Sequence, residues 1–235
     1  MIAFGSHRSG FDEVWICDRD GSNPTQLTHF ESLVSGHANW SPDGRRLVMS
    51  SDAAGNSDIY VMSVTEGVPR RLTDDDSEED YPSWSRDGRW IYFRSNRNGS
   101  FELYKMPADG GEAVQLTTAG GCFGFESPDG RSLFFTKREL WFGPRGIWRI
   151  PVEGGEEVKI HDRGEGNLWE VLDEGICYLN RGSVEFLEFS SGEVRRVAEV
   201  EGASVFGFAV SPDGQWAVYP RPEEEADIIL VENFR

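Results

Sequence analysis

The stretch Trp40-Ser41-Pro42-Asp43-Gly44 decides the fold, because its last four residues recur along the chain. The copies are Ser85-Arg86-Asp87-Gly88, Ser127-Pro128-Asp129-Gly130 and Ser211-Pro212-Asp213-Gly214. A degenerate copy, Leu172-Asp173-Glu174-Gly175, lies near the middle of the longest interval between two copies. A period of about forty residues indicates an architecture built from one repeated supersecondary unit.

The unit around the second copy is divided into four short strands by turn residues. Strands are predicted over 81–84, 90–94, 102–106 and 113–117. Asp87-Gly88 joins the first two, because Asp bonds its own backbone and Gly accepts a positive φ. Each unit therefore predicts one four-stranded antiparallel sheet.

Two further motifs keep the same phase. The third strands read Glu13-Val14-Trp15, Asp58-Ile59-Tyr60, Glu102-Leu103-Tyr104 and Gly146-Ile147-Trp148, and the fourth strands end in Leu27-Thr28, Leu72-Thr73 and Leu116-Thr117. The third strands are apolar on both faces, as expected of a sheet that is stacked between two neighbours. Radial stacking of such sheets is a β-propeller.

The fold class predicted is all-β, a single propeller domain over residues 1–235. Its units are about 1–28 (partial), 38–73, 81–117, 123–160, 168–198 and 204–235 (partial). Six blades are expected, two of them incomplete, and an open or partial propeller is the alternative. Because the partial units do not complement each other, we expect either a fragment of a longer protein or self-association through the incomplete blades.

The repeat resembles the TolB-like propeller repeat, a relative of the WD repeat, over nearly the whole chain. The resemblance rests on the Trp40 to Gly44 motif, on apolar strands such as Ile91-Tyr92-Phe93 and on the Leu-Thr ends. It implies a propeller that contacts other proteins, located in the periplasm for TolB itself. The end of the chain, Asp227 to Arg235, is similar to the C-terminal propeller region of winged-helix transcriptional regulators.

Composition excludes several classes of function. The formal net charge is −18, and no basic patch is present, so we expect no nucleic-acid partner. No run is long enough to predict membrane insertion, and the first residues lack the features of a signal peptide. Cys17, Cys122 and Cys177 match no zinc or redox spacing and are interpreted as buried small apolar residues.

The candidate site residues lie in loops expected on one face of the propeller. Near the central channel, His29, Glu31 and His37 are candidates for partner contact, although a metal site is not predicted because their spacing matches no zinc pattern. The acidic run Asp74, Asp75, Asp76, Ser77, Glu78, Glu79, Asp80 suits a basic partner or, as a lesser alternative, Ca²⁺. The loops around Arg8, Arg97 and Arg138 complete the face.

No Gly-x-Ser-x-Gly elbow occurs, so the chain is not predicted to be an enzyme. The leading hypothesis is a non-catalytic protein-interaction or scaffolding propeller with a protein or peptide partner and no cofactor. A ligand-sensing domain of a larger regulator is the first alternative. A hydrolase or lyase at the channel mouth, built from His29, His37 and neighbouring acids, is the second.

Overall fold

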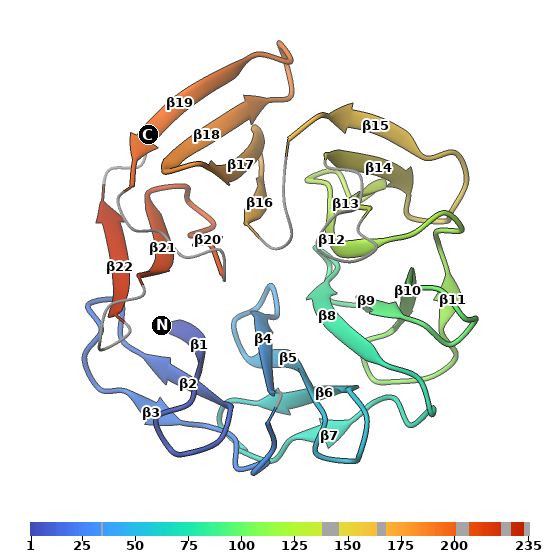
Figure 1. The fold of residues 1–235 in the computed structure, drawn as a ribbon, viewed down its shortest axis with the longest axis vertical. Helices are drawn as coiled ribbons and strands as arrows, with labels where there is room; N and C mark the ends of the chain where they lie inside the picture. Colours follow the sequence, from blue (N-terminus) through green and yellow to red (C-terminus); the bar gives the residue numbers. More distant parts are fainter. Residues whose placement is uncertain (34, 138–145, 164–167, 201–206, 222–226, 233–235) are drawn as a thin grey trace.

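Six antiparallel sheets are arranged around a central axis in the computed structural model (Figure 1), which describes residues 1–33, 35–137, 146–163, 168–200, 207–221 and 227–232. Every described element is a strand. The predicted all-β propeller of four-stranded antiparallel blades is therefore confirmed. Among the described residues, no helix is long and apolar enough to cross a membrane.

Four sheets are complete blades of four strands in sequential order. They are β4 (Ser35–Trp40), β5 (Arg46–Ser51), β6 (Asp58–Ser63) and β7 (Arg70–Arg71); β8 (Glu79–Trp84), β9 (Trp90–Ser95), β10 (Glu102–Pro107) and β11 (Val114–Gln115); β12 (Cys122–Glu126), β13 (Ser132–Thr136), β14 (Ile147–Pro151) and β15 (Val158–His161); β16 (Trp169–Leu172), β17 (Gly175–Asn180), β18 (Ser183–Glu188) and β19 (Val194–Glu199).

The first and last sheets have three strands each. They are β1 (Ile2–Ser6), β2 (Glu13–Cys17) and β3 (Thr25–Gln26), and β20 (Ala209–Val210), β21 (Trp216–Arg221) and β22 (Asp227–Glu232). The predicted number of six blades is not confirmed, because these two sheets each have only three strands. Complete four-stranded blades number four, not six, in the part of the chain that the structure describes.

The repeated Ser-x-Asp-Gly motif forms the turn between the first two strands of its sheet. Ser127 Oγ donates to Asp129 Oδ1 over 2.6 Å and accepts the backbone N–H of Ser132 over 3.0 Å. The same two bonds recur at Ser41, Ser85 and Ser211. The degenerate copy at 172–175 lacks the motif, and Leu172 pairs with Gly175 across a two-residue turn instead.

The core lies between neighbouring sheets. Val48 and Ile59 of the second sheet pack in one buried cluster with Ile91 and Phe93 of the third. Because each blade is covered on both sides, strands such as β6 are buried at almost every position. The fourth strand of the third sheet is shorter than predicted: β11 covers only Val114–Gln115 of the expected 113–117, and Thr117 bonds the side chain of Glu102 instead of continuing the ladder.

Candidate functional site

The connections from second to third strands and from each blade to the next lie on one face, which we call the loop face. This follows from the sequential antiparallel order of the strands. Most of the predicted site residues are in these connections, including Arg8, His29, Glu31, Arg97 and the acidic run up to Glu78, while Glu79 and Asp80 begin β8. His37 is different, because it lies within β4 on the inner side of the ring. Arg138 lies outside the described residues.

A buried hydrogen bond fixes the start of each blade-to-blade loop in the first three sheets. Thr28 Oγ1 donates to Glu13 Oε2 over 2.5 Å and accepts the N–H of Val14 over 2.8 Å. The other carboxylate oxygen of Glu13 accepts the backbone N–H of Glu31 over 2.8 Å. The third-strand acid and the Leu-Thr end, two separate sequence motifs, are thus the two halves of one contact.

The same bond joins Thr73 to Asp58 over 3.3 Å and Thr117 to Glu102 over 2.5 Å. Glu102 also accepts the N–H of Gly120, just as Glu13 accepts that of Glu31. We call this contact the acid–threonine clasp. It places the loop that follows each of these sheets at a fixed point of the loop face.

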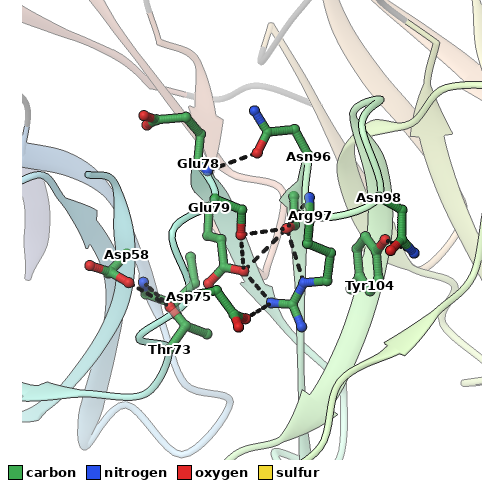
Figure 2. A network of polar contacts seen from close by, with 12 residues as sticks. Asp58, Thr73, Asp75, Glu78, Glu79, Asn96, Arg97, Asn98 and Tyr104 are labelled. Carbon is green, nitrogen blue, oxygen red and sulfur yellow. Dashed lines mark hydrogen bonds and ion pairs between the residues drawn. The ribbon is translucent and has the colours of Figure 1, made fainter.

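The acidic run divides into inward and outward residues (Figure 2). Glu79 is buried and forms an ion pair with Arg97, whose guanidinium also lies 3.1 Å from Asp75. Asp80 takes a bidentate contact from Arg94, with distances of 2.6 and 2.5 Å. The contacts of Glu79 and Asp80 lie within the third sheet, whereas Asp75 comes from the connection between the second and third sheets. Each of these three carboxylates is paired with an arginine and is unavailable to an anion cluster.

Asp74, Asp76 and Glu78 remain at the surface of the loop face. Glu78 still accepts the N–H of Ser57 over 3.2 Å, whereas the carboxylates of Asp74 and Asp76 have no bonded partner among the described residues. Two unpaired exposed carboxylates two residues apart leave a local negative potential. The outward part of the run is therefore smaller than the sequence indicates.

His29, Glu31 and His37 are not brought together by a shared contact. His29 Nδ1 accepts from Gln26 Nε2 over 3.1 Å, and Glu31 is exposed with a φ of +52°. His37 packs its ring edge-on to Tyr81, with 4.3 Å between centroids. Among the described residues, no group of three or more His, Cys, Asp or Glu side chains is placed to hold a metal ion.

His37 begins a row of rings on the inner strands that the sequence analysis missed. Its ring contacts Tyr81, and Tyr81 contacts Phe123 with 4.1 Å between centroids. Each has a φ of +51° at a β-bulge in its strand, a conformation that side chains of this size rarely adopt. All three stand four residues before the serine of the repeated turn, which was the available signal.

The surroundings of His37 set its charge. His37 is exposed on β4, and desolvation together with nearby Arg94 lowers the pKa of its ring to about 4. The ring is therefore neutral at pH 7 and acts in packing or as a neutral hydrogen-bonding group. Arg94 itself stacks over Tyr81, 4.7 Å from the ring centroid.

Two apolar side chains project from neighbouring loops at the first sheet. Leu33 is 71% exposed and Phe11 is 38% exposed. Their loops are joined by a hydrogen bond from the Asp12 N–H to the Ser32 carbonyl over 3.2 Å. Arg8, in the same loop as Phe11, stacks over Phe4 and Trp15 at 5.3 and 5.0 Å. The stacking of Arg8 therefore stabilises this loop.

Comparisons with known proteins agree with this architecture. The Tol-Pal system protein TolB of Desulfosudis oleivorans is 38% identical over 65 residues, which cover 28% of this chain and 15% of that protein. The crystal structure of TolB from Acinetobacter baumannii matches with a TM-score of 0.79 and 20% identity, covering 99% of this chain and 61% of that one. The chain thus spans less than two thirds of the length of these relatives.

The fold is shared with enzymes as well. Oligogalacturonate lyase from Vibrio parahaemolyticus has a TM-score of 0.67 at 13% identity, over 99% of this chain and 71% of the lyase. The sequence match is more specific than this likeness of fold: the family model described as the TolB beta propeller domain matches residues 1–143. That stretch holds the three clasps and the row of rings, and by it the chain belongs to the TolB beta-propeller family.

Proposed function

We propose that the chain is a non-catalytic binding propeller whose loop face, over the first three sheets, takes a protein or peptide with a basic, partly apolar segment. The observation that carries this is the exposure of Leu33 and Phe11 in joined loops on the same face as Asp74 and Asp76. Apolar anchors with charged groups at their edge are the usual anatomy of a recognition surface.

The loops of this face are held rigid, which favours binding. The clasps at Glu13, Asp58 and Glu102 fix where the loops begin, and the ion pair between Asp75 and Arg97 joins two of them. A preformed surface loses less conformational entropy on association than a loose one. The unpaired carboxylates attract a basic partner and raise its association rate.

The relatives support a role among proteins. TolB of D. oleivorans is named as a protein of the Tol-Pal system, so we propose that this chain takes its partner from a system of that kind. The solved lyase has the same fold, and the enzyme reading at His29 and His37 therefore stays a prediction, as does a ligand-sensing role. Binding of Ca²⁺ at the acidic run also stays a prediction.

Peptide binding measured by fluorescence anisotropy tests the proposal. A labelled peptide of alternating lysine and leucine is the probe, and the corresponding glutamate and leucine peptide is its control. The Phe11→Ser, Leu33→Ser double variant should weaken binding of the first peptide at least tenfold, because both anchors are lost. Asp74→Asn with Asp76→Asn should weaken it less and reduce its salt dependence.

Val68→Ser provides a matched control. Val68 is 73% exposed, like Leu33, but it lies in the turn between β6 and β7 on the opposite face. It should leave the affinity unchanged. Equal losses in Val68→Ser and in the Phe11 and Leu33 variant would overturn the assignment of the face.

Self-association is tested separately. β1 and β22 are each edge strands of three-stranded sheets, and edge strands offer unpaired backbone groups. We propose that pairing there joins two copies, so light scattering over a concentration series should show a dimer that dissociates on dilution. A constant monomer mass would overturn this pairing.

A further inference from the structure

The outer strand of the fifth sheet, β19, is the longest fourth strand among the complete blades. It has six residues, whereas β7 and β11 have two each and β15 has four. β19 is hydrogen-bonded to β18 on one side, and no described strand pairs with its other side. Figure 1 shows it at the outer rim of the ring. Short edge strands prevent unwanted pairing, and β19 lacks this protection.

The missing clasp accounts for the length of β19. In the first three sheets a threonine bonds an acid at the start of the third strand. In the fifth sheet Ser183 begins the third strand and pairs with Glu199, but the Oγ of Ser183 donates to the carbonyl of Asn180 over 2.9 Å. Glu199 accepts from Arg196 over 2.9 Å instead. No clasp draws the chain away, so the ladder continues to Glu199.

The register shows which backbone groups of β19 point away from the sheet. The N–H of Glu188 donates to the carbonyl of Glu193 over 3.0 Å, so Glu193 bonds towards β18. Bonded pairs alternate in an antiparallel ladder, and Arg195 therefore also bonds towards β18. Val194 and Arg196 turn their N–H and C=O groups outward. These four groups have the spacing that one more strand requires.

One face of this edge is apolar. Val194 is 42% exposed and pairs with Leu187, which belongs to the cluster shared with the fourth sheet. Phe189, in the turn before β19, is 37% exposed and stacks on Phe134 of the fourth sheet, with 5.3 Å between ring centroids. Val194 and Phe189 therefore point to the same side of the fifth sheet. Both offer contact area to a side chain placed beside them.

The other face of the edge is cationic. Arg195 is exposed, and its guanidinium lies 4.9 Å from the ring centroid of Phe186. Arg195 forms no ion pair with a described carboxylate, whereas the neighbouring Arg196 pairs with Glu199. The net charge of the chain is −18, yet this open edge presents an unneutralised cation. Charge complementarity therefore favours an acidic occupant.

We propose that the outer edge of β19 binds an extended acidic segment of another protein, which adds a fifth strand to this sheet. The backbone of the segment bonds the outward groups of Val194 and Arg196. Because side chains alternate along a strand, its carboxylates lie beside Arg195 and its apolar side chains lie beside Val194 and Phe189. A segment of alternating acidic and apolar residues fits both faces. This surface is separate from the loop face, so the inference does not depend on the proposed function.

Hydrogen exchange of backbone amides, measured by NMR, tests the added strand. The peptide of alternating glutamate and leucine, which is the control at the loop face, is the probe here. At saturation it should slow exchange at Val194 and Arg196 by about fivefold or more, because both N–H groups gain an acceptor. Arg195, which already bonds β18, should change by less than about twofold. Unchanged exchange at Val194 and Arg196 would overturn the site.

Variants test the two faces by fluorescence anisotropy with the same peptide. Arg195→Glu should weaken binding by about fivefold or more, because it reverses the charge beside the peptide carboxylates. Arg45→Glu is the matched control: it changes the net charge equally, in the exposed turn between β4 and β5, and should weaken binding by less than about twofold. Equal losses would overturn the site.

Val194→Pro tests the backbone contact. It removes one outward N–H at a position where an edge strand accepts proline, and should weaken binding by about fivefold or more. Circular dichroism checks that the variant keeps its fold. An unchanged affinity in the folded variant would overturn the added strand, and Arg195→Glu decides if the variant does not fold.

Two further outcomes separate this edge from other surfaces. The Phe11→Ser, Leu33→Ser double variant should bind the acidic peptide as the wild type does. A loss in that variant would place the peptide on the loop face and overturn the site at β19. Slower exchange of Val194 and Arg196 at rising protein concentration, without peptide, would show that a second copy occupies the edge and would overturn the acidic segment.

Discussion

The first three sheets and the fourth solve the same structural problem differently. In the first three, an acid at the start of the third strand and a threonine after the fourth strand close the sheet on itself. In the fourth, the strand pairing places Gly146 where the acid would be and His161 where the threonine would be. That sheet has no clasp.

The polar group of the fourth sheet bonds the next sheet instead. His161 Nε2 lies 3.0 Å from the hydroxyl of Tyr178, which donates to Glu185 over 2.7 Å. Glu185 also accepts from Asn180 over 2.8 Å and pairs with Arg163 at 3.1 Å. A repeat that has lost its own contact therefore keeps its place in the ring through a contact between sheets.

Among the variants that test this comparison, Gly146→Ala should cause the largest loss in the free energy of unfolding. Gly146 has a φ of +122°, and a Cβ there would lie 2.4 Å from the carbonyl oxygen of His161. Because a backbone atom must move, we expect a loss of about 3–5 kcal/mol in the free energy of unfolding, measured in urea.

Gly192→Ala is the control, since Gly192 also has a positive φ but open space at the Cβ position. It should cost only about 1 kcal/mol from backbone strain. If the two variants lose the same amount, close packing at Gly146 is not what holds the fourth sheet.

Thr117→Val should have the next largest effect, because it opens a clasp. The valine removes the donor to Glu102 and the acceptor for the N–H of Leu103, both of them buried. We expect a loss of about 2–3 kcal/mol in urea unfolding. Thr118→Val, at the exposed neighbour, should stay within about 0.5 kcal/mol. If Thr117→Val and Thr118→Val lose the same free energy of unfolding, the clasp contributes only as a packing contact.

The clasp shows what sequence reasoning can reach here. The phase of Thr117 and Glu102 was visible in the sequence and predicted the repeated sheets correctly. Their bond to each other was not predicted, because an acid fifteen residues from a threonine becomes its neighbour only when strands pair. The sequence repeat was enough to predict the architecture. The reason for the acid and threonine motifs became visible only in the register of the paired strands.

The candidate site was less predictable for a related reason. The acidic run is uniform in sequence, but Glu79 and Asp80 point inward to arginines from the loop after β9 and from β9 itself. The row from His37 to Phe123 depends on β-bulges, which leave little trace in the residue types. Glu170 lies in the degenerate repeat, where the turn motif is missing, so its strand register could not be predicted from the sequence.

Glu170→Gln should have a smaller effect on stability that depends on pH. The pKa of Glu170 is raised to about 8 in the folded protein, so its contribution is fully present below its unfolded pKa of about 4.3 and is lost as pH rises through 8. The free energy of unfolding of the variant, taken relative to that of wild type, should therefore increase by about 1–3 kcal/mol from pH 5 to pH 8.5. Parallel urea unfolding at both pH values measures the gain.

Glu174→Gln is the control for that measurement and should show no such gain, because Glu174 is exposed. A pH-independent difference between Glu170→Gln and wild type would show that the carboxylate finds a partner within the fold.

Ser127→Ala should have the smallest effect, because it alters one turn that the fifth sheet manages without. The variant loses the donor to Asp129 and the acceptor for the N–H of Ser132, at a cost of about 1 kcal/mol at pH 7. The serine bond lowers the pKa of Asp129, so its stabilisation is present above the unfolded pKa and is lost as pH falls through the lower folded value. The difference between Ser127→Ala and wild type in thermal unfolding should therefore shrink below about pH 4. A constant difference would assign the cost to the backbone bond alone, and a loss as large as that of Thr117→Val would mean that turn and clasp are equally needed.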